Sequence, residues 1–192
     1  MRYYILLITV LLIQTGCNDN TITQAEGEGV PASTVLTPIQ GFEGLSKAQL
    51  FLDGAVVEEG EVLDGLKHGS WVNFDNNGLI TSSVTYYKGV KQGASFELDN
   101  QGYISVYANY SNDELSGPYK VYNRRRLIEE RNYVNGKLEG ELRKFYQDGT
   151  LMEASNYRDG QLDGIARWYD TEGNLSIAYE YKEGKLVNQE AE

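Results

Sequence analysis

Short runs of alternating hydrophobic and polar residues, separated by turn-forming residues, make up most of the chain. In the run YISVYANY, the residues Ile104, Val106, Ala108 and Tyr110 occupy every second position. That spacing places them on one face of a β-strand, because side chains alternate sides along an extended backbone. The runs are bounded by DNNG, DNQG, YQDG and DTEG, whose Asn, Asp and Gly residues tolerate the positive φ of tight turns. We therefore expect strands and no long helix.

The pattern repeats with a period of 24 residues, and a glycine pair spaced G-x-x-x-G marks each copy. The pairs are Gly65/Gly69, Gly89/Gly93, Gly136/Gly140 and Gly160/Gly164, with fainter copies at Asp113/Gly117 and Gly184/Asn188. A tyrosine precedes most pairs by three residues: Tyr86, Tyr110, Tyr133, Tyr157 and Tyr181. Each copy holds two predicted strands. The fold class we expect is therefore all-β: about six 24-residue β-hairpins in an extended antiparallel meander, with a sheet one layer thick.

An aliphatic residue stands six positions before most of these tyrosines: Ile80, Ile104, Leu151 and Leu175. An even spacing along a strand predicts that the aliphatic row and the tyrosine row share one face of the sheet. The opposite face is more mixed, with Glu, Ser, Thr and Lys interspersed.

The N-terminal residues have the pattern of a targeting segment. Arg2 is followed by an apolar run of eleven residues, Tyr3–Ile13, which is too short to span a bilayer as a helix and is typical of a signal peptide. The next residues, Thr15-Gly16-Cys17, resemble a bacterial lipobox, which implies that Cys17 becomes a lipidated N-terminus. A protein with that signal is expected in the bacterial cell envelope, anchored by lipid in the outer membrane or at the cell surface.

These signals divide the chain into four parts. Residues 1–16 are the predicted signal peptide, and residues 17–43 hold Pro31, Pro38 and EGEG, which indicate a flexible tether. Residues 44–188 are the predicted hairpin array, and residues 189–192 are a C-terminal tail.

The stretch GKLEGELRKFYQDGTLMEASNYRDG resembles the bacterial variant of the MORN repeat, with its G-x-x-x-G turn, aromatic strand, D/N-x-G turn and strand ending in tyrosine. The resemblance covers roughly residues 44–188 and implies the hairpin fold. Bacterial proteins of this kind include YwqK-type antitoxins and surface or secreted repeat proteins. An exported lipoprotein would not meet a toxin in the cytoplasm.

Composition excludes several classes of function. The chain has 28 acidic and 17 basic residues, a net charge of −11, so nucleic acid is not an expected partner. Cys17 is the only cysteine, which excludes an intrachain disulfide and a cysteine-rich metal site. His68 is the only histidine and falls in a predicted solvated turn. We expect no enzyme, no cofactor, no metal and no small-molecule ligand.

Two features are candidates for binding. The row Tyr86, Tyr110, Tyr133, Tyr157 and Tyr181 either packs as ordinary cross-strand pairs or forms a half-exposed aromatic ribbon. Arg124, Arg125 and Arg126 crowd a turn where Arg126 replaces the usual glycine and one residue is missing before Tyr133. This turn is either solvated, with Glu129 and Glu130 as counter-charges, or a recognition point for an anionic ligand.

The function we expect is therefore a lipid-anchored scaffold of the envelope that binds an unidentified protein and attaches to the membrane through Cys17. An antitoxin or immunity protein that binds a toxin is one alternative. A module that binds the cell wall or a glycan is the other.

Overall fold

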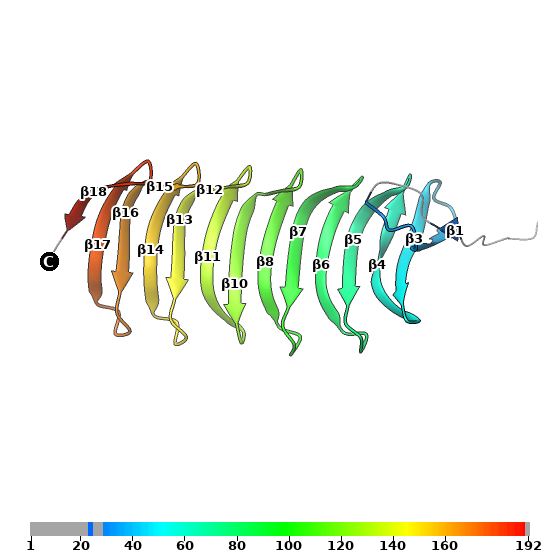
Figure 1. The fold of residues 1–192 in the computed structure, drawn as a ribbon, viewed down its shortest axis with the longest axis horizontal. Helices are drawn as coiled ribbons and strands as arrows, with labels where there is room; N and C mark the ends of the chain where they lie inside the picture. Colours follow the sequence, from blue (N-terminus) through cyan, green and yellow to red (C-terminus); the bar gives the residue numbers. More distant parts are fainter. Residues whose placement is uncertain (1–22, 25–28, 191–192) are drawn as a thin grey trace, which may run out of the picture.

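The computed structural model describes residues 23–24 and 29–190, and these residues form one long antiparallel sheet without a helix. Figure 1 shows the strands side by side in a single layer, in the order of the sequence. The predicted all-β meander is confirmed. The described residues therefore contain no helix that could cross a membrane.

The described residues contain eighteen strands. They are β1 (Thr23–Gln24), β2 (Val35–Pro38), β3 (Leu45–Leu52), β4 (Ala55–Leu63), β5 (Leu66–Phe74), β6 (Ile80–Tyr87), β7 (Val90–Leu98), β8 (Ile104–Ser111), β9 (Glu114–Leu115), β10 (Gly117–Asn123), β11 (Arg126–Val134), β12 (Lys137–Leu138), β13 (Gly140–Phe145), β14 (Leu151–Arg158), β15 (Gln161–Leu162), β16 (Gly164–Tyr169), β17 (Leu175–Lys182) and β18 (Lys185–Glu190).

Each long strand pairs with the long strands on either side of it in the sequence. β8 pairs with β10, β11 with β13, and β14 with β16, while the short strands β9, β12 and β15 lie beside the turns that join these pairs. Every hairpin therefore contacts mainly the hairpins before and after it, as in other repeat arrays.

The G-x-x-x-G turns stack on one another along one long edge of the sheet, which we call the glycine edge. The amide of Gly160 donates to the carbonyl of Leu138 at 2.9 Å, and the amide of Gly184 donates to Leu162 at 2.8 Å. Gly160 has a φ of +81°, in the left-handed region that glycine adopts without steric cost. The first glycine of the motif therefore closes its own turn and bonds to the preceding one.

The second glycine of each pair lies directly opposite a repeated tyrosine on the next strand. Gly164, for example, pairs with Tyr181. The other pairs are Gly69 with Tyr86, Gly93 with Tyr110, Gly117 with Tyr133, and Gly140 with Tyr157. This register explains why the sequence repeats glycine and tyrosine together. The glycine allows the backbone to turn, and because it has no side chain it leaves room for the tyrosine ring on the neighbouring strand.

A β-bulge lies beside the aliphatic row, near the turns on the edge opposite the glycine edge. The pairing shifts by one residue just before Phe74 meets Ile80, and again just before Leu98 meets Ile104. The same shift precedes the pairs Phe145–Leu151 and Tyr169–Leu175. A bulge interrupts the two-residue alternation of side chains. The count of six residues from the aliphatic row to the tyrosine row therefore does not establish that they share a face.

The N-terminal end of the array is closed by a small hydrophobic core. Val30, Ala48, Val62 and Trp71 are buried there, with Leu36 and Tyr86 packed against them. β2 pairs with β3, so the described residues from 29 onward are part of the fold and not a free tether. The sheet therefore begins before residue 44, and β18 continues it to Glu190.

Gly60 is the tightest position in this core. A Cβ atom there would lie 2.5 Å from the ring of Trp71, which is only 1% exposed and donates its indole N–H to the carbonyl of Glu61 at 2.9 Å. We predict that Gly60→Ala displaces the ring and lowers the free energy of unfolding by about 1–3 kcal/mol. Urea unfolding followed by tryptophan fluorescence measures the change.

The control is Gly78→Asn, at a turn glycine with a φ of +78° and no neighbouring atom within 4 Å. Asparagine visits the left-handed region at modest cost, so this variant should lose less stability. Equal losses in the two variants would contradict the proposed contact between Gly60 and Trp71.

Candidate interaction surface

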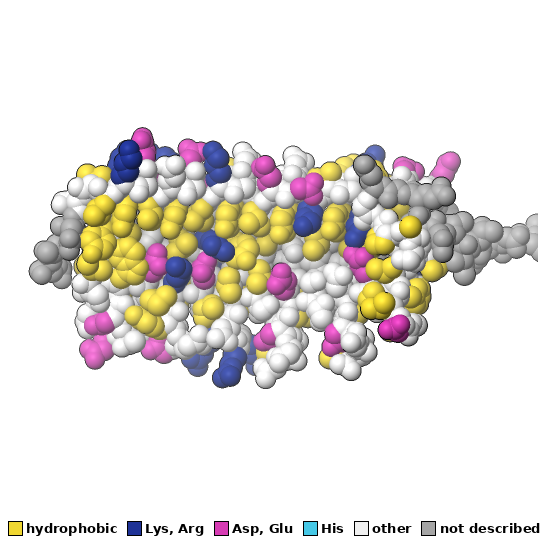
Figure 2. Space-filling view, in the orientation of Figure 1, with side chains coloured by type: hydrophobic (Ala, Val, Ile, Leu, Met, Phe, Trp, Pro, Cys, Tyr) yellow, Lys and Arg dark blue, Asp and Glu magenta, His cyan; other side chains and the backbone are white. Residues whose placement is uncertain are grey.

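The five repeated tyrosines lie on one side of the sheet, which we call the tyrosine face. All five are half-buried. Leu115, Leu138 and Leu162 stand directly across from Tyr110, Tyr133 and Tyr157. Figure 2 shows that hydrophobic side chains on this face form a continuous band along the array, nearer to the glycine edge than to the other edge.

Cations cover several rings of the band. The Nζ atoms of Lys67 and Lys91 lie 5.4 Å and 5.2 Å from the ring centres of Tyr86 and Tyr110. The guanidinium of Arg131 lies 5.6 Å from the ring centre of Tyr133. Contacts of this kind stabilise exposed sites by about 0.5–1 kcal/mol each. Tyr86, Tyr110 and Tyr133 are therefore partly covered by side chains of the same chain.

A row of paired charges runs beside the band. Lys144 Nζ lies 3.0 Å from Glu153, and the hydroxyl of Ser155 donates to the same carboxylate at 2.8 Å. Glu129 pairs with Arg131 at 3.1 Å. The hydrogen bond with Glu153 raises the pKa of Lys144. Because the charges pair within the chain, this row offers a polar border with little net charge.

The last hairpin replaces the charged row with aromatic side chains. Trp168 stands at the position of the repeat that Lys144 occupies one copy earlier, and its ring lies 5.8 Å from Tyr179. Tyr179 in turn lies 6.4 Å from Tyr181. Sequence reasoning missed Trp168 and Tyr179, although the 24-residue period places them on the tyrosine face. The hydrophobic band is widest at this end of the array (Figure 2).

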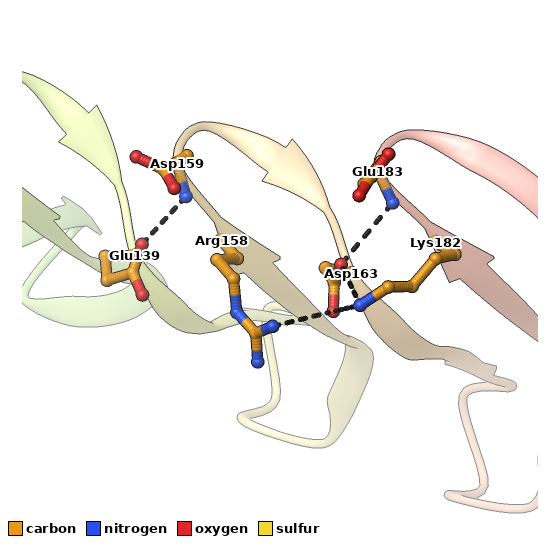
Figure 3. Close-up of polar contacts among 6 residues, drawn as sticks. All are labelled: Glu139, Arg158, Asp159, Asp163, Lys182 and Glu183. Carbon is orange, nitrogen blue, oxygen red and sulfur yellow. Dashed lines mark hydrogen bonds and ion pairs between the residues drawn. The ribbon is translucent and has the colours of Figure 1, made fainter.

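The charged residues on the glycine edge join one turn to the next (Figure 3). Glu139 accepts a hydrogen bond from the amide of Asp159 at 2.8 Å. One repeat later, Asp163 accepts from the amide of Glu183 at 3.4 Å and pairs with Lys182 at 3.0 Å and Arg158 at 3.8 Å. These carboxylates hold the stacked turns together.

The arginine turn differs from its predicted form. Asn123 pairs with Arg126, so the missing residue falls in the turn itself, and Arg126 begins β11 instead of replacing the turn glycine. The turn residues Arg124 and Arg125 have φ values of +48° and +72°. The predicted counter-charges are engaged elsewhere, because Glu129 pairs with Arg131, and Glu130 pairs with Lys120 and Arg143.

The structure does not bring the arginine turn and the tyrosine row together. Arg126 and Tyr133 are at opposite ends of β11. Seven residues of extended strand separate them by about 23 Å. The sequence-predicted site is therefore two separate places, one on the tyrosine face and one on the edge opposite the glycine edge.

His68 is not a solvated turn residue. It lies in β5, paired with Glu61, and its ring is 5.6 Å from that of Tyr87. Among the residues that the structure describes, no group of three or more His, Cys, Asp or Glu side chains is arranged to hold a metal ion. The predicted lipidation site, Cys17, lies outside the described residues.

Comparison with known proteins supports the repeat assignment in the C-terminal part. Residues 138–159 and 162–183 match the family model of the MORN repeat variant, which suggests a repeat-based module for protein interaction or membrane association. No curated protein matches the chain. The crystal structure of TarM is similar over 51% of this chain and 20% of that chain, with 18% identity and a TM-score of 0.34. The chain thus spans about a fifth of the length of TarM.

The ion pairs of Asp163 with Lys182 and Arg158 predict that the stability of the fold depends on pH. The hydrogen bond from Lys182 is the largest of the contacts that hold the pKa of Asp163 below its ordinary value of 3.8. A carboxyl with a lowered pKa stabilises the fold above its unfolded pKa, and that stability is lost as the pH falls through the folded pKa. We predict that Asp163→Asn is less stable than the wild type at pH 7 and that the difference shrinks below about pH 4.

Urea midpoints at a series of pH values from 7 to 3 measure this effect. Asp53→Asn is the control, since it removes one carboxylate from an exposed turn without removing an ion pair to a described residue. A stability difference for Asp163→Asn that stays constant with pH would show that the carboxylate charge is not responsible.

Proposed function

We propose that the protein is a non-enzymatic scaffold that binds another protein on the tyrosine face and is held at the bacterial cell envelope by a lipid on Cys17. The observation that carries the proposal is the continuous hydrophobic band on that face (Figure 2). In a sheet of single thickness, no second layer of the described residues covers this band.

The dimensions of the band suit an elongated partner. Tyr86 is on β6 and Tyr181 is on β17. Eight strand spacings separate them, a distance of about 38 Å. A stable protein–protein interface buries about 800 Å² on each partner, which is more than a narrow band of this length provides. The partner would therefore also contact the paired charges beside the band, as the polar rim of the interface.

The half-buried tyrosines suit such a surface. Burial raises the pKa values of Tyr86, Tyr110 and Tyr157 above the ordinary value of 10.0, so these hydroxyls stay protonated and able to donate at neutral pH. Tyrosine is common in interfaces because its ring is apolar and its hydroxyl is polar. A ring already packed across from a glycine also loses little conformational freedom when a partner binds.

We predict that Tyr110→Ser with Tyr157→Ser reduces capture of the partner by about tenfold, because the change removes two anchors from the band, on either side of Tyr133. The measurement is a pull-down from envelope extract with the folded variant, quantified for each captured protein. Tyr107→Ser is the matched control, because Tyr107 pairs with Phe96 and Lys120 on the opposite face.

Equal capture by the folded double variant and the wild type would contradict a binding role for the tyrosine face. Tyrosine-dependent retention on purified wall polymer, without a captured protein, would favour the glycan-binding alternative.

The location depends on Cys17. We predict that Cys17→Ser shifts the protein from the membrane fraction to the soluble fraction, because the thiol that would carry the lipid is gone. Fractionation of cells that express each form measures the shift, with Ser116→Ala as a control that changes one hydroxyl within the array. Membrane retention of the Cys17 variant at the wild-type level would contradict the anchor.

A further inference from the structure

The edge opposite the glycine edge exposes more large hydrophobic side chains than the tyrosine face does. We call its N-terminal part, in the first three copies of the repeat, the apolar turn edge. Its exposed members are Phe51, Leu52, Leu79, Ile80, Tyr103 and Ile104. Leu79 is 62% exposed and Ile80 is 44% exposed. The last two copies have the polar residues Thr150 and Asn174 at the position of Leu79 and Tyr103. The apolar turn edge therefore ends at the arginine turn.

A cleft opens between two successive turns of this edge. It has a volume of about 660 Å³, and its lining includes Leu79, Ile80 and Leu98 together with the carboxylates of Asp75 and Asp99. Asp75 already accepts hydrogen bonds from the amides of Asn77 and Leu79 within its own turn. The sides of the cleft are thus apolar, and its two carboxylates already accept hydrogen bonds from backbone amides of their own turns.

The next gap along the edge is filled by the chain itself. In this gap the guanidinium of Arg125 lies 4.8 Å from the ring centre of Tyr103, while Arg126 donates to the carbonyl of Gln147 in the turn on the other side. These contacts hold two of the three arginines in place. Arg124 is exposed and makes no hydrogen bond or ion pair with another described residue.

The backbone of the arginine turn is strained for these residues. Positive φ at both central positions is typical of a type I′ hairpin turn, which favours Asn-Gly. The other two-residue turns of the array place glycine second, as in Asp159-Gly160, except Asn112-Asp113. There the carboxylate of Asp113 accepts from the amide of Lys91 at 2.8 Å, which accounts for the exception. Arg125 makes no comparable backbone contact, and its contact with the ring of Tyr103 does not require a positive φ.

We propose that the arginine turn and the apolar turn edge form a second binding site, for an extended protein segment that carries carboxylate side chains at one end and apolar side chains along the rest. The carboxylates pair with the guanidinium groups of Arg124 and Arg125, which offer planar, bidentate donors. The apolar side chains lie on Tyr103 and Ile104 and enter the cleft beside Leu79. Strained backbone in a native protein is typical of functional sites, and the left-handed backbone conformation of Arg124 and Arg125 is strained in this sense.

Charge favours an acidic peptide over an anionic membrane. A lipid surface would bring many negative charges against the whole edge, where the backbone bonds from Leu79 and Asn77 keep the pKa of Asp75 low and its carboxylate charged. A peptide can place its apolar side chains beside those carboxylates and its acidic groups only on the arginines.

The test measures the fluorescence anisotropy of a fluorescein-labelled peptide as the full chain is added. The peptide carries two Glu residues at one end and Leu and Phe residues along the rest. We expect Arg124→Asn with Arg125→Gly to weaken binding by about tenfold or more, because two charge-assisted pairs are lost. The same variant should melt at the same temperature as the wild type or higher, because Asn-Gly suits the turn. Arg124→Lys with Arg125→Lys should bind more weakly than the wild type, since lysine cannot pair bidentately.

Two controls separate this site from the tyrosine face. Arg158→Ala removes an exposed arginine of the glycine edge and should leave peptide binding unchanged. Tyr110→Ser with Tyr157→Ser should also leave it unchanged, so this proposal and the proposed function can fail independently.

Four outcomes would overturn the proposal. One is wild-type affinity for the peptide in the Asn-Gly variant, and another is the absence of measurable binding to the wild type. The third is a clear fall in the melting temperature of the Asn-Gly variant, which would mean that the arginines hold the turn. The fourth is arginine-dependent binding to vesicles of anionic phospholipid without binding to the peptide.

Discussion

The array depends on the pairing of a tyrosine with a glycine directly across the strand. Where Tyr181 meets Gly164, the glycine has a φ of +114°, and a Cβ there would lie 3.3 Å from that of Asn156. The position is therefore closed to larger residues for two reasons, backbone strain and crowding. With glycine at this position, the strand can bend into the turn on the glycine edge while the tyrosine remains on the tyrosine face. The glycine–tyrosine pair thus sets both the register of the two strands and the face on which the tyrosine lies.

Stability built in this way is local. Each turn bonds to the next through an amide such as that of Gly160 and a carboxylate such as Asp163, so each hairpin depends on its neighbours. The ends cannot use the same contacts. At the N-terminal end, Val30 and Trp71 supply a small core in place of a preceding hairpin. In the last hairpin, Trp168 and Ile177 replace the charged pair of the copy before it, and Trp168 packs against Tyr179.

Periodicity in the sequence was sufficient to predict the hairpins, their antiparallel order and the common face of the tyrosines, because these depend on contacts that recur every 24 residues. Features that occur between copies were not predictable in the same way. The bulge beside Ile80 breaks the simple alternation without a sequence signal of its own. Val30 lies outside the repeat and is buried only because the first hairpin lacks a neighbour. The sequence shows that one residue is missing near Arg126, but not that the missing residue belongs to the turn.

Departures from the repeat are the most informative positions, because the contacts between copies already account for the repeated glycines and tyrosines. Asp113 departs from the glycine rule and is explained by its bond to Lys91 in the preceding turn. Lys91 departs from the leucine at its position in later copies, and it lies over the ring of Tyr110. Arg125 also contacts a tyrosine, yet that contact does not require a left-handed backbone. When the strain of a residue's backbone exceeds the stability that its contacts within the chain provide, a binding partner is the explanation for that residue. For a guanidinium, the partner is an anionic group.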